Sequence, residues 1–346
     1  MAKSVLIIYT GGTIGMINNP DTGVLCPFNF DQIARTVPEI KEFDFHIDSY
    51  TLPEIIDSSN LKPQLWVDLC HIITENYDKY DGFVILHGTD TMAYSASALS
   101  FMLDNLNKPV VFTGSQLPIG TIRTDGRENL ITSLEIAAAY NKDKAIVPEV
   151  CVLFGDKLVR GNRTTKFDAE NFNAFQSFNY PPLAEIGIHI NYDYNAIHYP
   201  QSEESIKAFT ELDSNIAILK IFPGIRSEAI DAIVNIPGLK GLILETYGSG
   251  NAPTEISFIN SIKRAAEKGI IIYNVTQCQG GSVEMGRYET SCELLNHGVI
   301  SGYDITTEAA VCKMMYLLGR YKDSNEIKKY LKSALKGELT KNDIWF

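Results

Sequence analysis

Two threonine-bearing turns hold the residue types best suited to chemistry in this chain. They are residues 10–15 (TGGTIG) and residues 87–91 (HGTDT). Each follows a short apolar run, residues 5–9 in one case and 83–86 in the other, which is typical of a buried parallel strand. Because ligands of open α/β sheets bind beyond the carboxyl ends of the strands, both turns would face one small substrate. The turns offer two threonine hydroxyls, the Asp90 carboxylate and backbone N–H groups that glycine leaves accessible. These groups suit nucleophilic attack on an acyl or amide carbon.

Each of these residues also has a structural explanation. Thr13 considered alone suits a helix cap, and Asp90 or Thr91 is well placed to cap the next helix. Thr89 changes the balance, because a hydroxyl beside a carboxylate supplies a proton-relaying group and an anchor for an ammonium ion. The two turns together are therefore more consistent with a reactive site than either is alone.

A third segment, residues 160–166 (RGNRTTK), carries three cations. A loop of this kind is ordinarily solvated, but a reactive hydroxyl needs a base, and a lysine shielded from water can lose its proton. A nearby carboxylate such as Asp90 would favour the charged form of Lys166. We therefore interpret this network as a proton shuttle.

Two further polar clusters could be either structural turns or ligand-binding segments. Residues 57–60 (DSSN) read as a turn, but adjacent hydroxyls with exposed N–H groups would also bind a carboxylate. Residues 248–251 (GSGN) follow a strand of the second half of the chain. Motifs of dinucleotide, P-loop and serine-hydrolase sites are absent from the sequence, and His87 has no second ligand at metal-binding spacing. We expect a structural His87, no metal and no cofactor.

Composition limits the possible partners. Lys and Arg number 30 against 42 Asp and Glu, so the net charge of −12 disfavours a nucleic-acid partner. No signal peptide or membrane-spanning run is visible, so we expect no membrane association. The six cysteines are scattered without a C-x-x-C pair, which favours a reducing cytoplasm.

Alternating strand-like and helix-like segments predict the fold. A chain of 346 residues favours two domains. We expect an α/β protein with a larger N-terminal domain, a doubly wound and mainly parallel sheet, over residues 1–190. Pro, Asn, Tyr and Ser crowd between about residues 181 and 214, and we place the linker at 191–212. A smaller C-terminal α/β domain would occupy residues 213–346. An irregular stretch around Pro20 and Gly23 would suit a lid over the site.

Taken together, these segments resemble the L-asparaginase family, in particular its cytoplasmic type I branch. The similarity extends in order from residue 10 to beyond residue 337, and two threonine motifs with a lysine motif are highly specific. The matching segments are TGGTIGM at 10–16, DSSN at 57–60, HGTDTMAYSASALSFML at 87–103, TGSQLP at 113–118, RTDGRENL at 123–130, RGNRTTK at 160–166, YGSGNAP at 247–253 and TQC at 276–278.

The resemblance implies a role for each matching position. Thr13 corresponds to the nucleophile, and Thr89, Asp90 and Lys166 correspond to a second catalytic group. The implied substrate-binding residues are Asp57, Ser58, Ser59, Thr89, Asp90, Ser115 and Asn251, the last reaching a neighbouring subunit of a homodimer or homotetramer. The implied reaction is hydrolysis of L-asparagine to L-aspartate and ammonia through an acyl-threonine ester.

Two other functions are compatible with parts of this pattern. The glutamine-hydrolysing subunit of a transfer-RNA amidotransferase shares these motifs but carries an extra N-terminal domain before them. In this sequence the first motif begins at residue 10, so we expect the asparaginase arrangement instead. A non-catalytic amino-acid-binding regulator on the same scaffold would not need paired hydroxyls and a lysine. The sequence does not distinguish asparagine from glutamine, which differ by one methylene.

Overall fold

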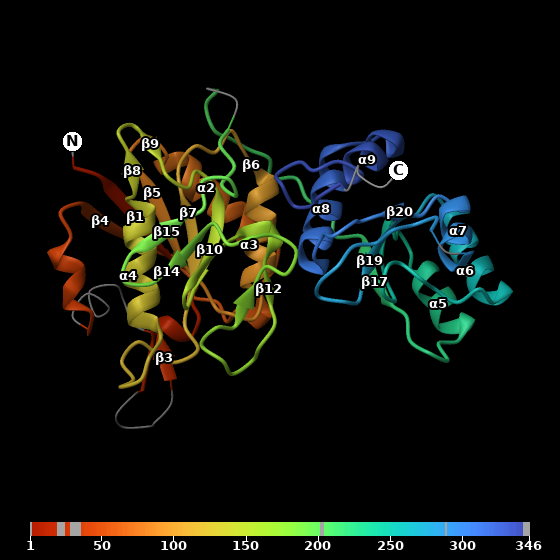
Figure 1. Ribbon diagram of the computed structural model, residues 1–346, viewed down its shortest axis with the longest axis horizontal. Helices are drawn as coiled ribbons and strands as arrows, with labels where there is room; N and C mark the ends of the chain where they lie inside the picture. The colour runs from red at the N-terminus through yellow and green to blue at the C-terminus, as the bar shows by residue number, and fades with distance from the viewer. Residues whose placement is uncertain (1, 19–24, 28–35, 201–203, 288, 342–346) are drawn as a thin grey trace. The chain divides into compact units, whose positions relative to one another are not determined.

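Apolar strands separated by helices build two large sheets, one in each of two compact units (Figure 1). The computed structural model describes residues 2–18, 25–27, 36–200, 204–287 and 289–341. The units are Met1–Thr210 and Glu211–Phe346. Residues 190–192 and 207–208, at or within the stretch that the sequence assigned to the linker, form strands of the first unit. The chain therefore passes between the units near residue 210.

The first unit has an eight-stranded sheet whose strand order is β15-β14-β11-β10-β7-β5-β1-β4. The strands from β10 to β4 are parallel, and β11, β14 and β15 extend the sheet in antiparallel fashion. This arrangement confirms the predicted mainly parallel sheet. The strands are β1 (Ser4–Tyr9), β4 (His46–Thr51), β5 (Gly82–Leu86), β7 (Val110–Thr113), β10 (Val150–Phe154), β11 (Lys157–Arg160), β14 (Ala184–Ile186) and β15 (Ile190–Tyr192).

Helices cover both faces of this sheet, as in a doubly wound fold. Helix α4 (Gly126–Ala137) repeats its apolar side chains at helical spacing, with Leu130 and Leu134 packed into the core beneath Val5 and Ile7 of β1. Helix α3 (Met92–Met102) contacts β7 and β10, and α2 (Gln64–Asn76) packs beside α3. The central strands β1, β5, β7 and β10 are buried on both sides, which explains their continuous apolar sequences.

Helix α3 is shorter than the sequence indicated. The sequence predicts a helix from about residue 92 to residue 105, but α3 ends at Met102. The next two residues form β6 (Leu103–Asp104), which pairs with β16 (Lys207–Ala208), and Asn105 has a φ of 60°. The helix therefore ends because Leu103 adopts an extended conformation and joins this ladder.

Short ladders complete the first unit. The strands β2 (Met16–Asn18) and β3 (Leu25–Pro27) pair with each other, as do β8 (Tyr140–Asn141) and β9 (Lys144–Ala145). Pro20 and Gly23 of the predicted lid lie outside the described residues. The remaining ladder, β12 (Thr165–Lys166) with β13 (Phe175–Gln176), carries the candidate lysine.

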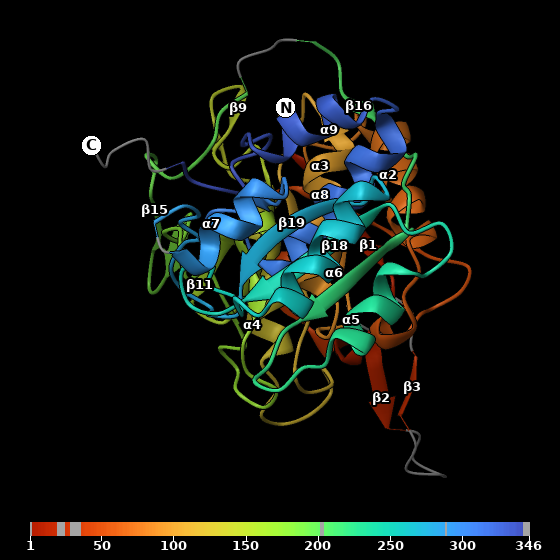
Figure 2. The same cartoon turned by 90° about the vertical axis from the view of Figure 1, so that its right-hand side faces the viewer.

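The second unit is a smaller four-stranded parallel sheet of order β17-β18-β19-β20. Helix α5 contacts β17, and helix α6 contacts β19 and packs against α5 (Figure 2). The strands are β17 (Ile216–Lys220), β18 (Gly241–Thr246), β19 (Ile271–Thr276) and β20 (Ile300–Ser301); the helices are α5 (Ser227–Val234), α6 (Ile256–Glu267), α7 (Glu289–Asn296), α8 (Thr307–Arg320) and α9 (Ser324–Leu331). In the described parts of the chain, no helix is long and apolar enough to cross a membrane.

A fully buried ion pair fastens the C-terminal segment to α8. The Lys313 Nζ lies 2.6 Å from the Glu338 Oε1, and neither side chain is exposed. Lys313 also donates to the Leu331 and Ser333 carbonyls, and Glu338 accepts from the Leu335 amide. Burial alone would raise the pKa of Glu338, but the Lys313 ammonium and the backbone amides lower it below its ordinary value. Both charges are therefore satisfied by partners.

Removing one partner of this pair should destabilise the protein strongly. Glu338→Gln leaves a buried ammonium without its counter-ion, and we expect the free energy of unfolding to fall by about 3–5 kcal/mol. The exposed pair Lys207–Glu204 provides the control, since Glu204→Gln should leave stability nearly unchanged. Urea unfolding of both variants measures this, and equal effects of the two substitutions would contradict the interpretation.

Candidate active site

The two threonine-bearing turns lie against each other, backbone to backbone. Gly12 has a φ of 88°, and a Cβ placed on it would meet the Gly88 nitrogen and Cα at 2.5 Å. A Cβ on Gly88 would in turn lie 2.7 Å from the Ser58 Cβ. Because any side chain at these glycines would push the segments apart, glycine is what allows both turns and residues 57–59 to converge.

Hydrogen bonds join the same three segments. The Thr10 amide and hydroxyl both donate to the Leu86 carbonyl, at 3.0 and 2.9 Å. The Ile56 amide donates to the Thr10 carbonyl at 2.9 Å. The Thr91 hydroxyl donates to the Ser58 carbonyl at 2.9 Å, so Thr91 occupies the N-cap position of α3 without capping it through its side chain. The carboxyl edge of β1 and β5 is thus one connected polar surface.

Lys166 joins this edge from a distant part of the sequence. Its Nζ donates to the Thr89 Oγ1 at 2.9 Å and to the Asp90 Oδ1 at 2.7 Å. The Lys166 side chain is 18% exposed and the Asp90 side chain 62%. The three residues meet because the short 3₁₀ turn η4 (Gly161–Arg163) packs on α3, where a Cβ on Gly161 would lie 3.1 Å from the Ala96 Cβ. The structure therefore brings the predicted triad together.

A second buried ion pair holds the loop that carries Lys166. The Arg160 Nε lies 2.6 Å from the Glu149 Oε2, and the Arg160 guanidinium stacks 4.4 Å from the Tyr180 ring centroid. Burial alone would lower the pKa of Arg160, but Glu149 outweighs it and raises that pKa. The Thr164 hydroxyl donates to the Arg160 carbonyl at 2.7 Å. The cations of this loop, apart from Lys166, thus have a structural role rather than a solvated one.

Thr13 lies in a short 3₁₀ turn, η1 (Thr13–Gly15), directly after Gly12. Its side chain is partly exposed. Within the described residues, the Thr13 hydroxyl makes no hydrogen bond, whereas the Thr89 hydroxyl is held by Lys166. The two threonines therefore differ: one hydroxyl is available to react, and the other belongs to a charged network.

Residues 57–59 present polar groups beside these hydroxyls. The Asp57 Oδ1 accepts from the Ser59 amide and from the Ser59 hydroxyl, both at 3.0 Å. This carboxylate caps the 3₁₀ turn η3 (Ser58–Asn60), and Ser58 is buried against Gly88. Asp57 and Ser59 remain exposed, so a carboxylate and a hydroxyl of fixed orientation face solvent at the sheet edge.

The other two predicted binding residues lie in different surroundings. Ser115 follows β7, is 1% exposed, and donates its hydroxyl to the Leu117 carbonyl at 2.5 Å. These contacts give Ser115 a role within its own loop, and direct substrate contact stays a prediction. Asn251 belongs to the second unit, where its amide donates to the Tyr247 carbonyl at 2.8 Å.

His87 is structural, in agreement with the expectation from sequence. Its Nδ1 lies 2.7 Å from the Gly88 carbonyl, and its Nε2 lies 2.9 Å from the Ser95 Oγ, which accepts from the Trp66 indole at 2.9 Å. Since a carbonyl only accepts, Nδ1 carries the proton and Nε2 accepts from Ser95. Complete burial lowers the pKa of His87 to about 4. In the part of the chain that is described, no group of three His, Cys, Asp or Glu side chains could hold a metal ion.

The sequence did not reveal these supporting side chains. Trp66 and Ser95 are 29 residues apart, and Glu149 lies outside every motif. The one available signal was Tyr9, a phenol at the last position of an otherwise aliphatic strand. Its hydroxyl donates to the Gly15 carbonyl at 2.9 Å.

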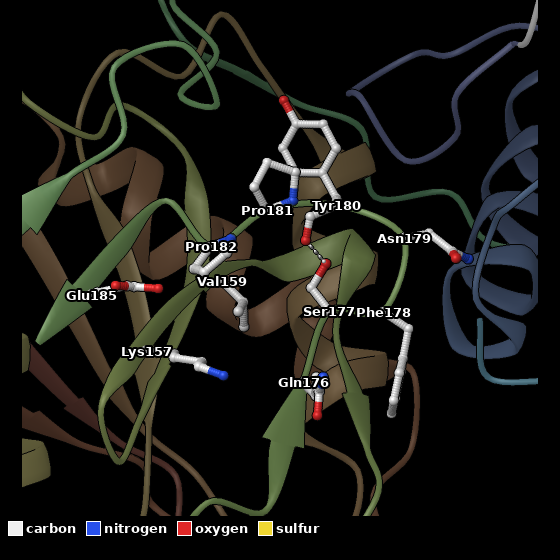
Figure 3. A pocket seen from close by; sticks show the side chains of 10 residues that line it. All are labelled: Lys157, Val159, Gln176, Ser177, Phe178, Asn179, Tyr180, Pro181, Pro182 and Glu185. Atoms are coloured by element: carbon white, nitrogen blue, oxygen red, sulfur yellow. Dashed lines mark hydrogen bonds between the residues drawn. The ribbon is translucent and has the colours of Figure 1, made fainter. Parts of the chain in front are cut away.

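A cavity of about 390 Å³ lies apart from the reactive groups, against β11 and β13 (Figure 3). Lys157 and Glu185 line one side of it, and Tyr180 and Pro181 another. The Ser177 hydroxyl donates to the Tyr180 carbonyl at 2.8 Å within its wall. Its lining includes neither threonine of the turns nor Lys166, so this cavity is distinct from the candidate active site.

The fold and the converging turns correspond to one known class of protein, and the chain belongs to the asparaginase family. Residues 4–198 match the family model described as "Asparaginase, N-terminal". Residues 215–331 match the "Glutaminase/Asparaginase C-terminal domain". Family membership confirms the resemblance seen in the sequence.

Full-length relatives share this architecture. The chain is 43% identical to the L-asparaginase 1 of Escherichia coli strain K12, over 99% of each chain. The structure of L-asparaginase I from Vibrio cholerae superposes with a TM-score of 0.88 at 39% identity, covering 98% of this chain and 100% of that one. A glutamyl-tRNA(Gln) amidotransferase subunit from Pyrococcus abyssi is 36% identical, and the match covers 97% of this chain and 76% of that protein.

The buried His87 should make stability depend on pH. The unfolded chain binds a proton at this imidazole below about pH 6.5, whereas the native protein does so only near pH 4. Stability should therefore fall as the pH drops through this window, with a His87 contribution of about 3 kcal/mol.

Urea unfolding at several pH values, compared with His87→Gln, measures this contribution. The stability difference between the parent and His87→Gln should shrink as the pH falls from 6.5 to 4. The exposed His71, changed to Gln, serves as the control and should track the parent. A difference that does not vary with pH would contradict the assignment.

Proposed function

We propose that this protein hydrolyses L-asparagine to L-aspartate and ammonia, with Thr13 as the nucleophile. The observation that carries the proposal is the contact of the Lys166 ammonium with both Thr89 and Asp90, beside the turn that holds Thr13. Two relatives that match over nearly their full length are named L-asparaginase, which supports this substrate. Binding alone would not require a hydroxyl held by a partly buried lysine.

The reaction takes place in two steps. The Thr13 Oγ attacks the side-chain amide carbon of asparagine, and its proton passes to the departing nitrogen through the Thr89–Lys166–Asp90 network. The C–N bond breaks, ammonia leaves, and an aspartyl ester remains on Thr13. Water then attacks the ester carbon, gives one proton to Thr13, and releases aspartate.

The surrounding groups suit the charges of this substrate. The carboxylates of Asp57 and Asp90 would bind the α-ammonium, and the segment that holds Ser58 and Ser59 would bind the α-carboxylate. Backbone N–H groups of the glycine turns would stabilise the developing oxyanion. Each anchor comes from a segment that the close glycine contacts hold in place.

The working unit in this proposal is a cytoplasmic homodimer or homotetramer. The first unit carries the catalytic groups, and Asn251 of the second unit would reach the site of a neighbouring subunit. Ser115 would support the substrate pocket from the loop after β7. No cofactor takes part. Sedimentation at micromolar concentration tests the assembly, and a fully active monomer would contradict it.

Removal of either threonine hydroxyl should abolish turnover without unfolding the protein. We expect Thr13→Ala and Thr89→Val each to lower kcat by at least about 100-fold, because a nucleophile or a proton-transferring group is lost. Ammonia release from L-asparagine and L-glutamine, measured in parallel, gives kcat for both substrates. Thr74→Ala, which removes a hydroxyl bonded only within α2, is the control. If Thr13→Ala remains active while Thr89→Val is inactive, the roles of the two threonines are reversed.

Lys166→Met should depress kcat much more than it changes KM. The substitution keeps much of the side-chain length but removes the ammonium that contacts Thr89 and Asp90. We expect a fall in kcat of at least about 100-fold. Lys207→Met, which removes an exposed and ion-paired lysine, should leave both constants unchanged. Unaltered kcat in Lys166→Met would refute the proton-relay role.

A further inference from the structure

Tyr9 is a buried phenol that the proposed reaction does not use. It is the last residue of β1, is 1% exposed, and packs in the core with Ile14. Its hydroxyl donates to the Gly15 carbonyl at 2.9 Å, at the end of the turn that begins with Thr13. The strand beneath the turn therefore contacts it directly through this one side chain.

The Tyr9 hydroxyl completes the hydrogen bonding of the turn. The Gly12 carbonyl accepts from the Gly15 amide at 3.3 Å, and the Ile14 carbonyl from the Ile119 amide at 3.4 Å. The Thr13 carbonyl accepts from the amide that follows the turn. Gly15 is the remaining carbonyl, and its bond from Tyr9 is shorter than those accepted by the Gly12 and Ile14 carbonyls. Since hydrogen bonds weaken with distance, Tyr9 makes a major contribution to holding the turn.

The Tyr9 ring also packs tightly against Gly15. A Cβ added to Gly15 would overlap the Tyr9 hydroxyl and ring, so the ring lies directly on the Gly15 Cα. Burial raises the pKa of Tyr9 to about 12, and the phenol is protonated and able to donate at physiological pH, as it would be at its ordinary pKa. Gly12 fixes the other end of the turn against Gly88.

We infer that Tyr9 is a positioning residue that sets the location of the Thr13 hydroxyl relative to Thr89. Tyr9 acts through the Gly15 carbonyl and does not touch the reacting atoms. The inference rests on the proposed role of Thr13. Misplacing a reacting group by about 1 Å can cost about 100-fold in rate, so loss of one such bond should be visible in kcat.

Tyr9→Phe tests this inference because it keeps the ring and removes only the hydroxyl. We expect kcat to fall by about 10- to 100-fold with KM changed little. Two matched controls lose the same kind of bond elsewhere: Tyr140→Phe, whose hydroxyl donates to the Asp81 carbonyl, and Tyr273→Phe, whose hydroxyl donates to the Leu331 carbonyl. The controls should lower the melting temperature to a similar degree and leave kcat unchanged.

A second route disturbs the same contact without altering Tyr9. Gly15→Ala places a methyl group against the Tyr9 ring and should produce the same fall in kcat. Gly82→Ala is its control, since a Cβ there would overlap the Ala137 carbonyl at the opposite end of the strands. Incorporation of 3-fluorotyrosine at position 9 retains the hydroxyl and should preserve kcat near the parent value.

The outcomes separate this inference from the proposed function. A kcat loss in both Tyr9→Phe and Gly15→Ala, absent from the controls, supports the positioning role. Parent-like kcat in a folded Tyr9→Phe overturns it, as does an equal loss in Tyr140→Phe. If Tyr9→Phe does not fold, the other two proteins provide the test. A kcat loss in Gly15→Ala together with a parent-like kcat in the fluorotyrosine protein supports the positioning role, and a parent-like kcat in Gly15→Ala overturns it. Parent-like kcat in Thr13→Ala would instead overturn the proposed function itself.

Discussion

The site depends on three chain segments approaching one another more closely than any side chain would permit. Gly12 lies on Gly88, and Gly88 lies on Ser58, so each contact is made by backbone atoms or by the first side-chain atoms. Two positions satisfy different demands, since Gly12 needs a left-handed φ of 88° whereas Gly88 needs only space. The proposed chemistry depends on this proximity, because it brings two hydroxyls some 75 residues apart in the chain, those of Thr13 and Thr89, to one sheet edge.

Buried polar groups then orient what the glycines bring together. The Glu149–Arg160 ion pair supports the loop that delivers Lys166, and neutral His87 links Trp66 and Ser95 to the Gly88 carbonyl. Buried polar groups stabilise a structure only when their partners are in place, so these networks favour a single arrangement of the edge. The carboxylates of Asp57 and Asp90 remain exposed at this edge. The hydrophobic core stabilises the sheet, while these polar networks orient the segments that carry the reactive side chains.

Sequence patterns predicted the class of fold and the motifs that meet at the sheet edge because both have local signals. Continuous apolar strands ending in glycine turns identify parallel strands and their functional edge, and the Thr89–Lys166 contact confirms that two distant motifs meet. The patterns missed details that tertiary contacts determine. Helix α3 ends at Met102 because Leu103 is extended and pairs with Ala208, and β15 joins the sheet although it overlaps the expected linker 191–212. The supporting contacts of Tyr9, Trp66 and Glu149 depend on tertiary packing, which leaves no periodic trace in the sequence.

The kinetics of Gly88→Ala test whether the close backbone packing of the turns creates the active site. A single methyl group at this position would collide with Ser58, although the backbone conformation of Gly88 does not itself require glycine. We expect a folded protein whose kcat/KM for L-asparagine falls by at least about 100-fold. Gly187→Ala, where the nearest atom to an added Cβ is 3.8 Å away, should keep the parent value. Parent-like kcat/KM in Gly88→Ala would contradict the claim that close backbone packing of the turns creates the active site.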